Sequence, residues 1–206
     1  MTSDIRHYDD GKPLNRSETL KRQLERDAAK HFLRLYEQEY KTPMRNIWHN
    51  EPSRPDISCH LNGKPLDLEI AHLYASASEA KILTREIVEQ FEQKSQGQLL
   101  DFANTVQPTA KEQALLNYLF ELINMDRAER LVTALSRILS SKCEKTYTSP
   151  RVWLVIRNAS PLWRAHDFER CIPFFHAQNA ASLNNPFEQI WLLPEFDGSE
   201  APIRLF

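Results

Sequence analysis

The chain has 206 residues, of which 41% are hydrophobic and 26% charged, and its formal net charge is -2. This length supports one substantial hydrophobic core, and the near-neutral charge gives no overall attraction to nucleic acid or to an anionic membrane. Only four glycines and no GxxxxGK(S/T) or GxGxxG pattern argue against a phosphate-cradling nucleotide fold. Three separated cysteines without a CxxC pair, and no long apolar run, predict a soluble protein of the reducing cytoplasm.

The first predicted elements follow a polar segment, residues 1–16, which we expect to be flexible. Residues 17–40 repeat apolar side chains at three- and four-residue steps, which predicts a helix. A weak strand pattern at 46–49 comes next. Two alternating runs then flank Asn62-Gly63, and this combination is the strongest short-range signal of a β-hairpin.

The second half of the chain alternates helical and strand patterns. The predicted elements are a helical segment at 76–91, one long or two shorter helices at 110–143, a strand at 151–158, a helix at 167–178 and a last strand at 187–196. The strand at 151–158 is a continuous apolar run, typical of a buried central strand. Pro173 is expected to bend or restart its helix. We therefore expect one α/β domain over 17–206, with a mixed β-sheet flanked by helices and a helical insertion at about 97–143.

The Asn62-Gly63 turn also determines which residues face one another across the hairpin, because a two-residue turn fixes the register and side chains alternate between faces. Asp56 then lies opposite Glu69. One face of the hairpin is apolar and is predicted to be core: Ile57, Cys59, Leu61, Leu66, Leu68 and Ile70. The opposite face carries the polar residues Asp56, Ser58, His60, Asp67 and Glu69.

Three carboxylates, those of Asp56, Asp67 and Glu69, thus gather on one strand face, where like charges destabilise a sheet unless a counter-charge is present. Two interpretations account for them. They form either a solvent-exposed polar face or a site for a hard divalent cation such as Mg²⁺ or Mn²⁺, which prefers oxygen ligands. The pattern of residues leaves both interpretations open.

The element order and the motif Pro55-Asp56 with Asp67-Leu68-Glu69 resemble the PD-(D/E)xK nuclease superfamily, which has the restriction-endonuclease-like fold. That family has an αβββαβ core, Pro-Asp and (Asp/Glu)-x-Lys on neighbouring strands, and an acidic residue on a preceding helix. The resemblance implies a divalent-metal-dependent nuclease in which Asp56, Asp67 and Glu69 bind Mg²⁺ or Mn²⁺. Glu69 stands where the family usually has lysine.

In the family this lysine positions or activates the attacking water, and some members supply it from a neighbouring helix. Lys142 and Lys145, near the end of a helical pattern, are the candidates here, and Lys142 is preferred. The alternative role is that of a cation favoured at a helix C-terminus. For the helix-borne acid we prefer Glu25 over Glu39, because Glu25 falls on the predicted inward face. Its alternative role is a surface pair with a nearby cation.

The implied function is hydrolysis of DNA or RNA. Because the motif lacks its lysine, a catalytically inactive binding or assembly module with the nuclease fold is the alternative. Nucleic acid is the expected partner, since nine Lys/Arg against four Asp/Glu lie between Arg127 and Arg170. The apolar segment 115–123 is a candidate homodimer surface, with burial inside the insertion as the alternative. A third interpretation is an unrelated α/β protein with a solvated acidic face.

Overall fold

The computed structural model describes most of the chain outside the predicted insertion. The described residues are 6–7, 16–50, 55–76, 79–80, 110, 113–114, 116–117, 120, 126–179, 185–194 and 200–206. The chain divides into two compact units, one formed by residues 1–73 and 136–206 and the other by residues 74–135. All the candidate site residues belong to the first unit.

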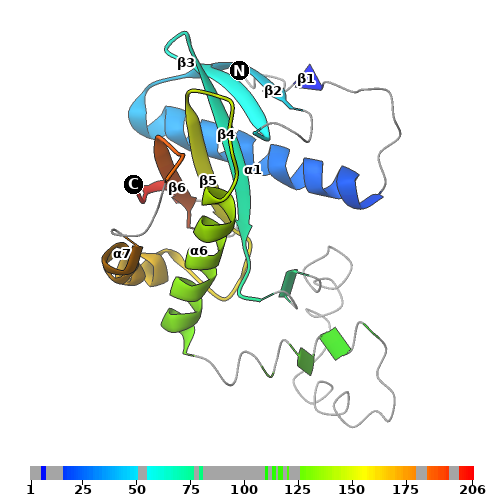
Figure 1. Ribbon diagram of the computed structural model, residues 1–206, viewed down its shortest axis with the longest axis vertical. Coiled ribbons are helices and arrows are strands. Elements are labelled where there is room, and N and C mark those ends of the chain that lie inside the picture. The colour runs from blue at the N-terminus through cyan, green and yellow to red at the C-terminus, as the bar shows by residue number, and fades with distance from the viewer. Residues whose placement is uncertain are drawn as a thin grey trace. The chain divides into compact units, whose positions relative to one another are not determined.

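The first unit is built on a mixed β-sheet with the strand order β1-β2-β3-β4-β5-β6-β7 (Figure 1). The strands are β1 (Arg6–His7), β2 (Met44–His49), β3 (Ile57–Leu61), β4 (Lys64–Leu73), β5 (Val152–Asn158), β6 (Gln189–Leu193) and β7 (Ile203–Arg204). Strands β2, β3 and β4 form an antiparallel meander, whereas β4, β5 and β6 run parallel. The helices are α1 (Arg16–Tyr40), α6 (Arg127–Cys143) and α7 (Ala165–Asn179). The predicted α/β class with a mixed sheet is confirmed.

The long periodic patterns predicted their elements closely. The helix expected at 17–40 is α1, the hairpin is β3-β4, and the apolar strand is β5 between β4 and β6. The turn has the predicted positive φ angles, 52° at Asn62 and 74° at Gly63. Asn tolerates this left-handed backbone region, and Gly adopts it without a steric penalty because it has no side chain. This is why the dipeptide suits the turn.

Two predictions about the C-terminal half differ from the structure. Helix α7 continues through Pro173, so it does not restart there, and a bend at Pro173 stays a prediction. Because Pro173 is exposed, water can satisfy the carbonyl oxygen one turn earlier that the proline leaves without an N–H donor. Strand β6 ends at Leu193, because Pro194 has no N–H to continue the ladder.

Two short strands carried no sequence signal. Strands β1 and β7 contain two residues each, too few for any periodicity. The remainder of the predicted flexible segment 1–16, apart from Arg16, lies outside the described residues, as do most of the helical segment 76–91 and the first part of the predicted insertion. The last part of that insertion is α6.

Helix α1 packs on one face of the sheet through aromatic rings. Phe32 and Tyr36 contact Trp153 of β5 and Trp191 of β6, with ring centroids 5.5 to 6.5 Å apart. The apolar face of the hairpin joins the same core, and its six residues are at most 7% exposed. The prediction that this face is core is therefore confirmed.

The central strands are buried on both faces. In β5 Trp153 is 1% exposed, and the side chains that point to the opposite face, such as Leu154 and Ile156, are 0% exposed. Double burial explains why this strand reads as a continuous apolar run rather than an alternating one. Within the described part of the chain, no helix is long and apolar enough to cross a membrane.

Replacing Phe32 by alanine should lower the free energy of unfolding by about 3–5 kcal/mol, because the ring is fully buried against two tryptophans. Phe174→Ala is the matched control, since Phe174 is 68% exposed, and it should change the same free energy by less than about 0.5 kcal/mol. Urea denaturation of both variants measures the difference. Equal effects would contradict the assignment of Phe32 to the core.

Candidate active site

The hairpin has the register that its turn predicts. Ile57 pairs with Leu68, and the ladder continues to Leu61 opposite Lys64. Asp56 comes directly before β3, and its Oδ2 accepts a hydrogen bond of 2.7 Å from the backbone N–H of Ile70. Asp56 and Glu69 therefore lie together at one end of the hairpin, as expected.

Glu69 is a buried carboxylate held by two lysines. Its side chain is 4% exposed, and its Oε1 lies 2.6 Å from Lys142 Nζ and 2.9 Å from Lys145 Nζ. A buried carboxylate without counter-charges would be strongly destabilising, and the two lysine ammonium groups supply that counter-charge. The interpretation of a solvated acidic face is wrong for this residue.

The two lysines are held differently. Lys142, in the last turn of α6, also donates a 2.9 Å hydrogen bond to the carbonyl oxygen of Ile70, and its side chain is 19% exposed. Lys145 follows the helix, and its side chain is 52% exposed. Burial acts to lower the pKa of Lys145, but the hydrogen bond and charge of Glu69 outweigh this and raise it. Lys142 is thus fixed in place, whereas Lys145 faces solvent.

Asp56 is an acid whose ionisation is opposed by its surroundings. Burial, followed by the charges of Glu69 and Glu25, raises the pKa of Asp56 to about 6. The Ile70 N–H and the charge of Lys142 act in the opposite direction but do not cancel the effect. Glu69 and Glu25 thus place negative charge around Asp56, and such a surrounding attracts a cation.

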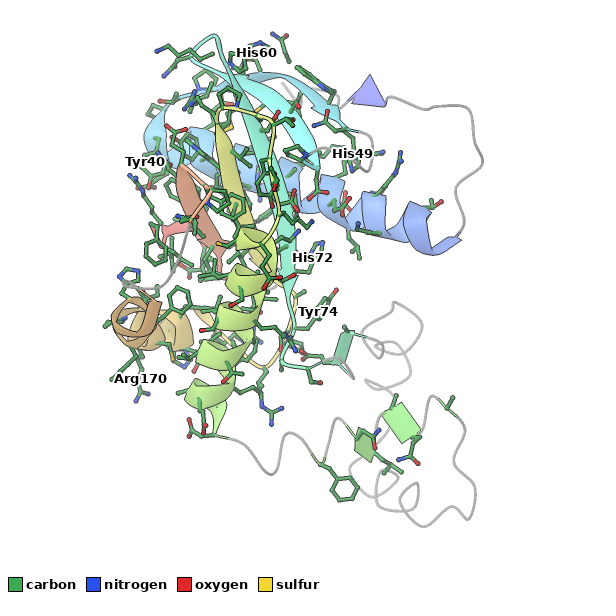
Figure 2. The ribbon with its side chains drawn as sticks, in the orientation of Figure 1. Tyr40, His49, His60, His72, Tyr74 and Arg170 are labelled. Carbon is green, nitrogen blue, oxygen red and sulfur yellow. The ribbon has the colours of Figure 1, made fainter. Side chains whose placement is uncertain are left out.

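Glu25 enters the same electrostatic group from α1. It is 4% exposed, which confirms the predicted inward face. Its Oε2 lies 3.2 Å from Nε2 of the buried His49, and its Oε1 lies 3.4 Å from Lys21 Nζ. Burial acts to raise the pKa of Glu25, but the bond to His49 and the charge of Lys21 hold it below the ordinary value. Figure 2 labels His49, at the end of β2 beside α1. Glu39 is exposed.

Asp67 has a different partner. It lies directly opposite Ser58 in the hairpin, and its Oδ1 accepts a 2.5 Å hydrogen bond from the Ser58 hydroxyl. Ser58 Oγ in turn accepts a 2.7 Å bond from the side-chain amide of Asn50. Asp67 shares the face of Glu69 two residues further along β4, a spacing of about 7 Å.

The described residues contain no group of three or more His, Cys, Asp or Glu side chains placed to hold a metal ion. Two carboxylate oxygens of the site, Asp56 Oδ1 and Glu69 Oε2, nevertheless accept no hydrogen bond from the described part of the chain. Mg²⁺ commonly uses only one or two protein carboxylates and completes its shell with waters and substrate phosphates. The donor set present fits that kind of site and does not fit an all-protein cage.

The basic stretch between Arg127 and Arg170 contributes several cations to ion pairs. Lys142 and Lys145 bind Glu69, and Arg151 Nε lies 2.8 Å from Glu188 Oε2. A nucleic-acid surface on this stretch stays a prediction. The candidate dimer segment 115–123 lies mostly outside the described residues.

No family model matches the chain, and no curated protein or solved structure shows significant similarity to it. The site is therefore interpreted from its own geometry.

Sequence reasoning named Asp56, Glu69, Lys142 and Glu25, which the structure brings close together, but it missed two residues that contact this group. His49 is one, since a single histidine in a weak strand pattern carries no signal of its glutamate partner 24 residues earlier. Asn50 is the other. Its position at a strand end, shortly before Pro55-Asp56, was the only available hint, because an Asn at a strand end often hydrogen-bonds nearby backbone.

Replacing Asp56 by asparagine should stabilise the protein at neutral pH. The folded protein holds the Asp56 proton up to a pH of about 6, whereas the ordinary pKa of this group is 3.8, so wild-type stability falls as pH rises through this window. The substituted amide would carry no charge yet still accept the Ile70 N–H. We expect a gain of about 1–3 kcal/mol at pH 8 and almost none below pH ~4. Thermal unfolding across pH measures this, with the exposed Asp27→Asn as control. A gain that is independent of pH would contradict the raised pKa of Asp56.

Lys142→Gln should destabilise the protein more than Lys145→Gln, because Lys142 is less exposed and makes a second bond to Ile70 O. We expect a loss of about 1–3 kcal/mol for Lys142→Gln and less than about 1 kcal/mol for Lys145→Gln. Chemical denaturation at pH 7 compares the two. The reverse order would show that the contacts of Lys142 are not those described.

Proposed function

We propose that this protein is a divalent-metal-dependent nuclease that hydrolyses phosphodiester bonds of DNA or RNA. The observation that carries the proposal is the contact of 2.6 Å between Lys142 Nζ and Glu69 Oε1, beside Asp56. A lysine from a separate helix thereby reaches the strand on which the resemblance expects one. The order α1-β2-β3-β4-α6-β5 further supports an αβββαβ core of the restriction-endonuclease-like kind.

The geometry favours a revised alignment of the motif. Glu69, which is buried beside Asp56, takes the place of the acidic residue in (Asp/Glu)-x-Lys, so that the lysine position falls at Ala71 on the same face of β4. Ala71 cannot supply a cation, and Lys142 takes that role from α6. Asp67 is then a neighbour of the motif rather than part of it.

Asp56 and Glu69 would hold Mg²⁺ or Mn²⁺, with Asp56 Oδ1 and Glu69 Oε2 as the available oxygens. Asp67 Oδ1 is taken by Ser58, so a role as third ligand, which stays a prediction, would fall to Oδ2. The bound cation would supply a water of lowered pKa and positive charge beside the phosphate. Glu25 adds negative charge on the helix side of Asp56, which strengthens the attraction for a cation.

The two lysines would have separate tasks. Lys142 pairs with Glu69 and, being fixed by its bond to Ile70 O, holds its ammonium group where it can orient the attacking water. Lys145 is half exposed and pairs with Glu69, so it can turn from that carboxylate to a phosphate oxygen of the substrate.

The direct test is cleavage of plasmid, single-stranded DNA and RNA by the purified protein with Mg²⁺ or Mn²⁺. Asp56→Asn and Glu69→Gln should each reduce the cleavage rate by about 100-fold or more, because each removes a proposed cation ligand. Glu37→Gln is the control, since Glu37 is an acid on α1 that pairs with Arg45 outside the site. No metal-dependent cleavage, or equal cleavage by all three variants, would refute the proposal.

The second candidate is a catalytically inactive binding or assembly module with the same fold. The observation in its favour is that Glu69 Oε1 is already neutralised by two lysines. Calorimetric titration with Mn²⁺ separates the candidates. The nuclease requires binding that Asp56→Asn and Glu69→Gln both weaken. A folded protein that binds no Mn²⁺ supports the module.

A further inference from the structure

We propose that Asn50 is a positioning residue that fixes the carboxylate of Asp56 and, through Ser58, that of Asp67. The purpose assigned to Asn50 rests on the proposed metal-dependent function, whereas the positioning itself rests on hydrogen bonds alone. Asn50 is 6% exposed and directly follows β2, so it is a buried polar residue at the edge of the acidic site.

Asn50 binds the Pro55-Asp56 dipeptide through both its backbone and its side chain. Its backbone N–H donates a 2.9 Å bond to the carbonyl oxygen of Asp56, and its Nδ2 donates a 2.6 Å bond to the carbonyl oxygen of Pro55. The Pro55-Asp56 dipeptide is thus held at two successive carbonyl groups by one residue.

These bonds matter because the sheet itself holds Asp56 weakly. The ladder between β2 and β3 ends at His49 opposite Ile57, and the ladder between β3 and β4 ends at Ile57 opposite Leu68. Asp56 lies one residue beyond both ends. Pro55 cannot donate a backbone hydrogen bond, so the contacts to Asn50 supply the constraint that the ladders do not.

A second path leads from Asn50 to Asp67. Nδ2 also donates to Ser58 Oγ at 2.7 Å. Because that oxygen accepts from Asn50, the Ser58 proton is directed to Asp67 Oδ1, and the two bonds polarise one another. Both hydrogens of one amide group are therefore used to align two acids of the site.

The backbone carbonyl oxygen of Asn50 extends this role to the third acid, Glu25. This oxygen lies 3.0 Å from His49 Nδ1, and the other ring nitrogen of His49, Nε2, faces Glu25. The bond at Nδ1 orients the ring toward Glu25. An aspartate at position 50 would have the same shape but no N–H₂ group to donate to Pro55 and Ser58, so the proposed role needs the amide.

The Ile70 amide provides a measurement of Asp56 position that requires no metal, because its hydrogen bond goes to Asp56 Oδ2. In Asn50→Ala, hydrogen exchange at the Ile70 amide, relative to that at Leu68 on the same strand, should accelerate about tenfold or more. Asn158→Ala is the matched control. Asn158 is 0% exposed and its amide also donates two bonds, to Trp163 and Pro194, but it lies in β5 opposite Leu73, away from the acids.

If Asn50→Ala does not fold, Asn50→Ser provides the same comparison with a smaller loss of volume. An Ile70-to-Leu68 exchange ratio equal to that of the wild type and of Asn158→Ala overturns the proposal. The Mn²⁺ dissociation constant is the second measurement, and Asn50→Ala should raise it about tenfold over Asn158→Ala. Equal Mn²⁺ affinities alongside a changed exchange ratio would overturn the role of Asn50 in metal binding.

The two proposals fail in different ways. A wild-type protein that neither binds Mn²⁺ nor cleaves nucleic acid refutes the nuclease. In that case the Ile70 exchange ratio still decides whether Asn50 positions Asp56.

Discussion

The register of the Asn62-Gly63 hairpin is the constraint on which the rest of the structure depends. A slip of β4 by one residue would move its three apolar side chains away from α1 and place Asp67 and Glu69 in the core. With the observed register, Leu68 and its neighbours belong to the same hydrophobic core as Phe32, and Glu69 faces the two lysines. The same turn therefore determines both the packing of the first unit and the composition of the site.

The buried acids of the site lower the free energy of unfolding of the protein. Burial, followed by the charges of Glu69 and Glu25, raises the pKa of Asp56, so three acids share a region that folding alone would fill with neutral side chains. Two lysines compensate Glu69 and one histidine accompanies Glu25. Asp56 is left with a backbone N–H as its hydrogen-bond donor among the described residues. Groups of this kind are typical of functional sites, where ligand binding requires charges that the empty fold does not need.

Local patterns predicted what local forces determine. The turn chemistry gave the hairpin register and the apolar face, and periodicity gave α1 with Glu25 on its inner side. Contacts between segments far apart in the sequence were harder to predict, because no periodicity describes them. Lys142 meets Glu69 across 73 residues of sequence, and only a family resemblance suggested a lysine from that helix. The partner of Asp67 could not be predicted, since the register alone does not show whether Ser58 donates to it or to water. The alternative that the helix would restart at Pro173 was wrong, because propensity rules ignore solvent at an exposed helix face.

The central claim is that Asp56, Glu69 and Lys142 form one metal-dependent site. A crystal structure with Mn²⁺, examined by anomalous scattering, tests it most directly. We expect an anomalous peak within coordination distance of Asp56 and Glu69, about 2.0–2.3 Å from their oxygens, with Lys142 Nζ still bonded to Glu69 Oε1. A peak elsewhere, or no peak at these carboxylates at saturating Mn²⁺, would contradict it.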